Sequence, residues 1–443
     1  MWWKTVTFLF FLILVEIQSQ AVNNGSTRVF CYYDGSNSLR EGFARVTLTD
    51  IKPALPFCTH LIYGFAGIDP TTNRIRALNE SLDLDSGKGQ YRAVTALKKD
   101  YPHLKVLLSV GFNRDRSDEP PHGKYLTLLE NAGMRMRFVN SVYSLLKTYG
   151  FDGLDLAWQF PQTKPKSTLK WTDRLWDGFR QLFTDESTSK PKPDARKEAF
   201  AEMVRDLKHA FRAGNFELCL TVLPHVSEPK YLDVYTLRSN VDYVNLAAFD
   251  LLTPERNPNE ASYTSPIDHH NPVYYRPSNS KDDNLERAFE VWRETDTKLE
   301  KIIVGIPTHG RGWKLSKDSE TSGVPPIAAN GSAIPGPFNG KPGLYSYPEV
   351  CTMLADSVKI GRALVKVEDL TKRLGVYAYR LPDAHGDDGI WISYGDPDSA
   401  RNKVAYARKR HLGGLSIFDL GNDDFRGTCG TGKFPILKAA VNI

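Results

Sequence analysis

The chain has 443 residues, 41% of them hydrophobic and 25% charged, and 57 Lys and Arg against 52 Asp and Glu give it a net charge of +5. These values are typical of a globular protein and exclude a disordered chain. The charge is mild for this length and no long basic run is present, so nucleic acid is not indicated as a partner. The length admits one large barrel or two to three ordinary domains.

The first residues have the pattern of a secretory signal peptide. Lys4 supplies the positive charge, residues 5–15 are apolar, and residues 19–21 resemble a cleavage site. A membrane anchor is the alternative, but the apolar segment is much shorter than the roughly 20 residues that span a bilayer. No later segment is long and apolar enough to do so. We therefore expect residues 1–21 to be a signal peptide and the mature protein to be secreted.

Secretion changes how the five cysteines are interpreted, because they are then expected to pair with one left over. Cys31 lies in the first apolar run and Cys58 just before the second, so these neighbouring segments are candidates for a link. Cys351 and Cys429 lie in the C-terminal third. Cys219 lies inside an apolar run, which favours a free buried thiol. Sequence alone does not fix the pairing.

Glycosylation is also expected in a secreted chain. Asn24, Asn79 and Asn330 each begin an Asn-x-Ser triplet in loop-like surroundings. We expect some of these three sites to carry a glycan.

Eight apolar runs of strand length recur along the chain with helix-like segments between them. Near-continuous apolar strands are typical of a parallel sheet that is buried on both faces. The predicted strands are Val29–Tyr33, Leu61–Ala66, Lys105–Val110, Gly153–Trp158, Leu218–Leu223, Tyr243–Phe249, Ile302–Pro307 and Gly414–Asp419. The amphipathic segments are Ala132–Tyr149, Ala195–Arg212, Asn284–Thr295 and Ser399–His411.

This alternation predicts an α/β fold, a closed (β/α)8 TIM barrel with functional groups at the C-terminal ends of its strands. An open doubly wound sheet is the alternative, but no Gly-x-Gly-x-x-Gly turn follows the first strand. Residues 311–390 are too long for a loop and contain Pro-rich turns and strand-like runs. We predict a small inserted α+β domain there, between strands 7 and 8, with the barrel formed by residues 22–310 and 391–443.

A second interruption, residues 162–193, follows the fourth strand and is longer than the usual βα loop of about two to six residues. Its lysines, with Trp171 and Trp176, suggest a receptor or proteoglycan contact. A charged, solvated loop is the simpler interpretation.

The segment Phe151–Pro161 carries the strongest chemical signal. Asp152 and Asp155 are carboxylates in an apolar strand, where an unpaired charge is costly. Asp155, Ala157 and Gln159 fall on one face because strand side chains alternate with period two, and in a barrel that face points inward. A glutamine amide neither gives nor takes a proton near neutral pH. The segment therefore has the layout of an acid–base site without its acid.

This segment resembles the signature of the family 18 chitinases, Phe-Asp-Gly-x-Asp-x-Asp-Trp-Glu-x-Pro. The matching residues are Phe151, Asp152, Gly153, Asp155, Trp158 and Pro161. In that family the Glu protonates the glycosidic oxygen and the preceding Asp orients the substrate's acetamido group, which is the nucleophile. Ala157 and Gln159 occupy those two positions here, so the resemblance implies a vestigial site with no catalytic residue.

Four further segments resemble other barrel strands of the family and depart from it where sugar is held. Phe112 replaces the second glycine of the third-strand motif, and Ala247 and Phe249 replace a Met and a Tyr in the sixth strand, where Asp250 remains. His309 replaces a Tyr in the seventh strand, and Phe418 replaces the Trp of the sugar floor in the eighth. The resemblance marks as ligand-binding candidates Trp158, Gln159, Asp250, His309 and Phe418.

Each candidate also has a purely structural interpretation. The two aspartates are then scaffold groups held by hydrogen bonds, and the aromatic residues are barrel packing. His309 as a substitute general base lacks a Ser or Cys nucleophile paired with it in sequence. His269-His270 lacks further ligands at metal-binding spacing, so no metal and no cofactor is predicted.

Within the family, Gln159, the long insert after that strand and the ending Asp423–Cys429 resemble the insect imaginal disc growth factors, secreted proteins regarded as inactive. The resemblance implies disulfides Cys31–Cys58 and Cys351–Cys429 with Cys219 free. It also implies a growth factor that promotes cell proliferation, cooperates with insulin and acts as a monomer on an unidentified cell-surface receptor or glycan. The alternatives are a lectin-like binder of chitin or related oligosaccharides and, third, a weak hydrolase.

Overall fold

The computed structural model describes residues 27–116, 123–163, 193–268, 283–317, 319, 325–355, 363–383 and 385–442. The predicted signal peptide, the acceptor Asn24, Trp171 and Trp176 of the long insert, and His269-His270 lie outside the described residues.

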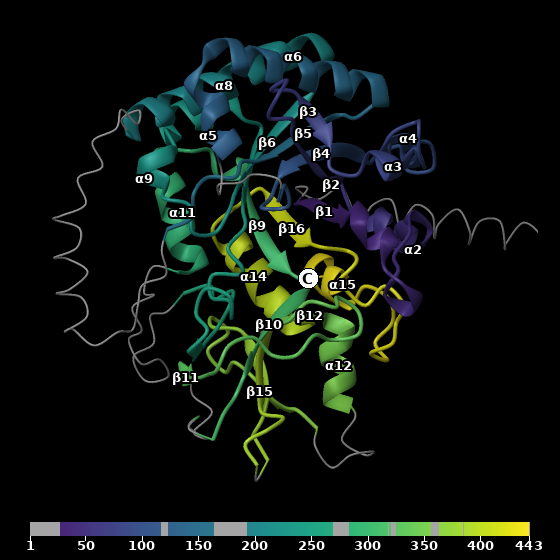
Figure 1. Cartoon of the computed structure of the whole chain (residues 1–443), viewed down its shortest axis with the longest axis vertical. Coiled ribbons are helices and arrows are strands. Elements are labelled where there is room, and N and C mark those ends of the chain that lie inside the picture. Colours follow the sequence, from purple (N-terminus) through teal and green to yellow (C-terminus); the bar gives the residue numbers. More distant parts are fainter. Residues whose placement is uncertain are drawn as a thin grey trace, which may run out of the picture.

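The eight predicted strands form a closed parallel barrel (Figure 1). Closure is visible in the pairing of the first strand, which is hydrogen-bonded to the second strand on one side and to the last on the other. The barrel strands are β1 (Arg28–Asp34), β2 (His60–Ile68), β4 (Lys105–Gly111), β5 (Gly153–Ala157), β6 (Glu217–Val222), β7 (Tyr243–Leu246), β9 (Ile302–Pro307) and β16 (Gly414–Phe418). The fold class predicted from the apolar runs is confirmed.

Helices surround the barrel, and the predicted amphipathic segments are among them. The predicted segment Ala132–Tyr149 forms α6 (Ala132–Tyr149), which begins where the Asn131 side chain accepts the Met134 N–H and ends at Gly150 with φ of 76°. The other helices are α2 (Leu48–Ile51), α3 (Glu80–Asp83), α4 (Gln90–Ala96), α5 (Gly123–Glu130), α8 (Pro193–Gly214), α9 (Glu228–Tyr231), α10 (Val234–Asn240), α11 (Leu285–Arg293), α12 (Tyr347–Ala355), α14 (Pro397–Lys409) and α15 (Pro435–Val441). Among the described residues, none of these helices has the length and apolarity that a membrane span requires.

A second, antiparallel sheet lies between β9 and α14 in the chain and at the bottom of Figure 1. Its strand order is β12 (Leu344–Ser346), β10 (His309–Lys314), β15 (Ile390–Tyr394), β14 (Val376–Arg380) and β13 (Val365–Val367). We take the stretch from the start of β10 to the end of β15 as the inserted domain, slightly wider than the expected 311–390. Two short strands, β8 (Glu260–Ala261) and β11 (Ile327–Ala328), pair antiparallel with each other. The strand β3 (Ile75–Ala77) pairs antiparallel with the C-terminal end of β2.

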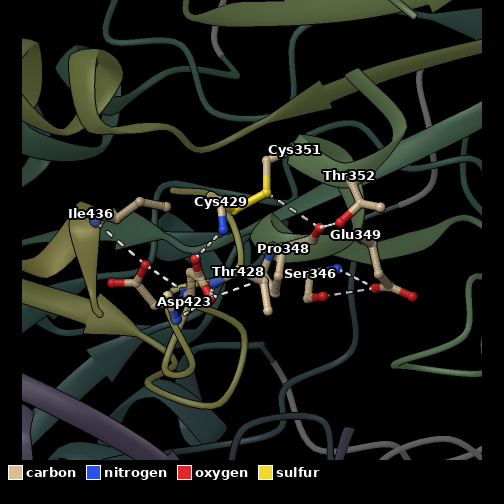
Figure 2. The surroundings of a disulfide bond; sticks show 11 residues. Ser346, Pro348, Glu349, Cys351, Thr352, Asp423, Thr428, Cys429 and Ile436 are labelled. Atoms are coloured by element: carbon tan, nitrogen blue, oxygen red, sulfur yellow. Dashed lines mark hydrogen bonds between the residues drawn. A yellow bond between two sulfur atoms is a disulfide. The ribbon is translucent and has the colours of Figure 1, made fainter. Parts of the chain in front are cut away.

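Two disulfides cross-link the chain. Cys31 in β1 is bonded to Cys58 just before β2. Cys351 in α12 of the inserted domain is bonded to Cys429 in the C-terminal loop of the barrel chain (Figure 2). Cys219 in β6 is a buried free thiol.

A buried lysine lies between α14 and the barrel. The side chain of Lys403 is 3% exposed, and its ammonium group is bonded to the hydroxyl of Ser265 and to the carbonyl of Gly305 at 3.2 Å. Burial lowers the pKa of Lys403 to about 7. No carboxylate is among these partners, so the charged form of the lysine is disfavoured in the folded state.

We expect Lys403 to make stability depend on pH. The folded state releases this proton near pH 7, whereas the unfolded chain keeps it to about 10.5, so the unfolded state holds more protons between these values and stability rises with pH. Between pH 7 and 9.5 the free energy of unfolding of the parent protein should gain about 3 kcal/mol relative to a Lys403→Met variant. Urea unfolding of both proteins at the two pH values measures this; an equal pH response of the pair would contradict it.

Candidate functional site

The inner carboxylate of the signature segment is held by hydroxyl groups inside the barrel. Asp155 in β5 is fully buried and accepts hydrogen bonds from Tyr32 (3.0 Å), Ser109 (2.7 Å) and Thr221 (2.6 Å). Burial raises the pKa of Asp155, although these three hydrogen bonds oppose the rise. With its oxygens occupied by residues of β1, β4 and β6, Asp155 joins strands that are far apart in sequence.

Asp152 lies at the opposite end of the same strand. Its carboxylate pairs with Lys98 at 2.8 Å, accepts the Val106 N–H at 2.8 Å and is about one-third exposed. Asp152 is therefore only partly buried, whereas the apolar surroundings of both aspartates in the sequence suggested burial. It precedes the strand, at the N-terminal end of the barrel, where its ion pair serves the scaffold.

Gln159 is bound on both sides of its amide by one backbone segment. Its Nε2 donates to the carbonyl of Asp115 at 3.3 Å, and its Oε1 accepts the N–H of Asp115 at 3.0 Å. The side chain is 3% exposed. Asp115 is itself buried and pairs with Lys124 at 2.6 Å. Gln159 thus fixes the loop after β4 and does not line the cavity of the barrel mouth.

Aromatic rings fill the centre of the barrel mouth. Phe112 stacks face to face on Phe418, with ring centroids 4.4 Å apart and planes 5° apart, and Phe249 stacks on Phe418 at 5.2 Å. The three side chains are 8%, 4% and 2% exposed for Phe112, Phe418 and Phe249. Tyr32 and Phe65 pack against the edge of this group. We call Phe112, Phe249 and Phe418 the aromatic plug.

The backbone of Phe112 explains why the resembling motif has a glycine at this position. Its φ is +53°, a left-handed conformation that is uncommon for a bulky residue and costs about 1 kcal/mol or more. The preceding residue has kept its glycine, since a Cβ on Gly111 would lie 2.3 Å from the Ala157 carbonyl oxygen. Stacking on Phe418 opposes the backbone cost at Phe112.

A charged triad lies beside the plug. Asp250 accepts a bidentate pair of bonds from Arg311 at 2.8 and 2.6 Å and a bond from His309 Nε2 at 2.9 Å. Burial alone would raise the pKa of Asp250, but the charges and hydrogen bonds of Arg311 and His309 hold it well below its ordinary value. Asp250 is therefore a fixed anion. It is an ion-pair partner and a poor proton donor.

Trp158 lies outside the barrel mouth. It packs edge-on against Tyr125 and Phe138 and tilted against Phe200, residues of α5, α6 and α8. Its ring is 2% exposed and does not line the cavity of the mouth. Its candidacy as a ligand-stacking residue is contradicted because alternation along the strand directs it to the helix layer, opposite Asp155.

A cavity of about 340 Å³ remains above the plug at the C-terminal ends of the strands. Of the five ligand-binding candidates, Asp250, His309 and Phe418 line it, whereas Gln159 and Trp158 do not. Five basic side chains also line it, against two carboxylates, Asp250 and Glu255. The basic residues are Arg114, Arg116, Arg256, Arg311 and Lys341.

Sequence reasoning missed Tyr32, Asp115 and the basic residues of the cavity. Tyr32 was visible only as an aromatic residue in an apolar strand, and its hydroxyl contacts Asp155 across 123 positions of sequence. Asp115 follows β4 without a motif of its own. The basic residues come from separate loops, and only folding brings them together.

The two remaining glycan acceptors differ in their surroundings. Asn330 is exposed. Asn79 is partly buried, and its carboxamide oxygen accepts the Leu82 N–H at 3.1 Å and the Ser81 hydroxyl at 2.8 Å. Glycosylation at these positions stays a prediction.

Comparison with known proteins adds to this geometry. The family profile "Glycosyl hydrolases family 18" matches residues 28–423. "Bacteria-responsive protein 1" of Aedes aegypti is 55% identical over 99% of both chains, and "Imaginal disk growth factor 6" of Drosophila melanogaster is 44% identical over 97% of this chain and 96% of that protein. Among solved structures, catalytic domain 2 of the Group II chitinase of Ostrinia furnacalis is 28% identical, with a TM-score of 0.74 over 94% of this chain and 95% of that one. The match over nearly the whole barrel, at this level of identity, shows that the chain belongs to glycosyl hydrolase family 18.

Proposed function

We propose that this chain is a secreted chitinase-like protein that does not hydrolyse chitin and promotes cell proliferation from outside the cell, in cooperation with insulin signalling. The proposal joins two parts. The first, loss of hydrolysis, is supported by the chemistry of the barrel mouth. The second, growth promotion, is supported by the family relatives.

The aromatic plug is the observation that carries the first part. Hydrolysis in this family needs a proton donor above a sugar ring seated at the eighth-strand aromatic residue. Here Phe112 covers the face of Phe418 at 4.4 Å, in the position of a stacked sugar. Gln159 has no proton to give, and both ends of its amide are bonded to Asp115. The barrel mouth therefore lacks both a free stacking surface for the sugar and a general acid to protonate it.

The same plug argues against the lectin alternative. An uncharged chitin oligomer gains much of its affinity from stacking on aromatic faces and from apolar burial. The ring that offers such a face is occupied by Phe112. We propose no tight binding of chitin in the barrel centre.

Growth promotion is supported by resemblance to named relatives. Besides the 44% identical growth factor of Drosophila melanogaster, a second 44% identical relative from that organism, "Chitinase-like protein Idgf2", aligns over 98% of both chains. The sequence features that suggested a signal peptide agree with an extracellular site of action.

The test is a proliferation assay with purified mature protein on cultured insect cells, with and without insulin. We expect higher cell numbers at nanomolar protein and a larger effect in the presence of insulin. Protein that has been reduced and alkylated should be inactive, because the fold loses both disulfides. If the alkylated protein were as active as the native protein, the growth would come from a contaminant. If the native protein were inactive, the growth-promoting role would be refuted.

A further inference from the structure

A ridge of positive charge divides two cavities at the barrel mouth. Arg114, Arg116 and Lys341 line both the 340 Å³ cavity above the plug and a neighbouring cavity of about 310 Å³ beside Phe65. The two cavities therefore meet at these three side chains, and we call the two cavities together the groove. We call Arg114, Arg116 and Lys341 the basic ridge.

The charges of the basic ridge are poorly neutralised within the protein. Arg114 is 3.7 Å from Asp34 and lies over the ring of Phe65. Within the described part of the chain, Arg116 and Lys341 have no ion pair, and both are exposed. The two carboxylates of the first cavity lie beside Arg311, because Asp250 is bonded to Arg311 and His309 and Glu255 is 3.8 Å from Arg311. Exposed cations that converge on a concave surface attract anions.

The pKa of Lys341 supports this view. Partial desolvation of its ammonium group in the groove, and then the charges of Arg114 and Arg116, lower this pKa to about 8, although Asp34 acts in the opposite direction and Arg40 adds to the lowering. The ridge thus carries an electrostatic cost that an anionic ligand would remove.

We propose that this groove binds an acidic oligosaccharide, with its sulfate or carboxylate groups on the basic ridge. An extended chain fits because the basic ridge lines two adjacent cavities, and a single small anion would need only one of them. Apolar residues beside the cations, Leu223, Pro342 and Leu344, offer surfaces for sugar rings. The plug blocks only the centre of the barrel, below this groove. The inference concerns binding alone and does not depend on growth promotion.

The test is calorimetric titration of the mature protein with a sulfated heparin hexasaccharide at 150 mM salt. Chitohexaose, sodium sulfate and hexaglutamate are the comparison ligands. We expect the sulfated hexasaccharide to bind at least tenfold more tightly than each of them. Equal binding of chitohexaose would show that the groove binds neutral sugars, as a lectin does. Preference for hexaglutamate would indicate an acidic peptide instead, and binding of sulfate alone would mean an adventitious ion only; each of these results overturns the proposal.

Charge-reversal variants separate the groove from the net charge of the protein. Arg116→Glu with Lys341→Glu should weaken hexasaccharide binding at least tenfold. Arg137→Glu with Arg205→Glu changes the net charge equally, on exposed residues of α6 and α8 that do not line either cavity, and should change binding less than about twofold. Equal losses in both variants would show nonspecific attraction. Melting temperatures of the two variants verify folding.

A conservative variant gives a second readout. Because Lys341 loses its proton near pH 8, hexasaccharide binding by the parent protein should weaken between pH 7 and 9. Lys341→Arg keeps its charge over this range and should remove most of that pH dependence. The same decline in both proteins would exclude Lys341 from the site.

Discussion

Restoring the two missing carboxylates, by Ala157→Asp with Gln159→Glu, should give no release from a fluorogenic chitooligosaccharide above the buffer blank. In an open family site the acid alone is worth about 10² to 10⁴ in rate. Here Phe112 covers the ring of Phe418, so no aromatic face is free for a sugar ring to stack on beside the restored acid. A glutamate at 159 would also lack the N–H that Gln159 donates to the Asp115 carbonyl. We expect the double variant to lose about 1–3 kcal/mol of unfolding free energy for this reason.

The control for this experiment opens the plug in the same background. Adding Phe112→Gly removes the ring and suits the left-handed backbone at that position. This triple variant should bind chitooligosaccharide, whether or not it also hydrolyses it. Efficient turnover by the double variant alone would show that the plug is no barrier to substrate.

Asp155→Ala should destabilise the fold by about 3 kcal/mol or more, because each buried donor that is left without its acceptor costs about 1–3 kcal/mol. The substitution leaves the hydroxyls of Tyr32, Ser109 and Thr221 without their shared acceptor in the barrel interior. It also leaves a cavity, which adds to the loss. Urea unfolding followed by fluorescence measures the difference.

Asp152→Ala is the matched comparison, on a carboxylate three residues earlier in the same segment. Its ion pair with Lys98 is partly exposed, so the loss should stay near 1–2 kcal/mol, mostly from the bond to the Val106 N–H. Equal losses for the two variants would contradict the structural role assigned to Asp155.

The barrel could be predicted because its signal is local. Each strand is a short apolar run that is buried on both faces, and eight such runs with helices between them leave few alternatives. The inward direction of Asp155 followed from alternation. The same rule directs Trp158 outward, yet family resemblance had placed it among the ligand-binding candidates, and the local physical rule was the better guide.

The plug and the basic ridge could not be predicted in this way. The plug combines three rings from the ends of β4, β7 and β16. The positive φ of Phe112 could not be predicted, because a Phe in the sequence gives no indication of a left-handed backbone. The basic ridge combines the loop after β4 with Lys341 of the inserted domain. Such contacts depend on tertiary positions, which a single sequence does not report.

The Cys351–Cys429 bond has a mechanical consequence for the mouth. The inserted domain leaves and re-enters the barrel through β10 and β15, which are adjacent strands of one sheet, so these two connections lie close to a single line. Rotation about such a line would be an easy way to widen or narrow the groove. The disulfide supplies a third, separate attachment from α12 to the C-terminal loop (Figure 2). Asp424 also holds this loop, by accepting the Cys429 N–H at 2.7 Å. This third attachment therefore opposes rotation of the inserted domain about that line.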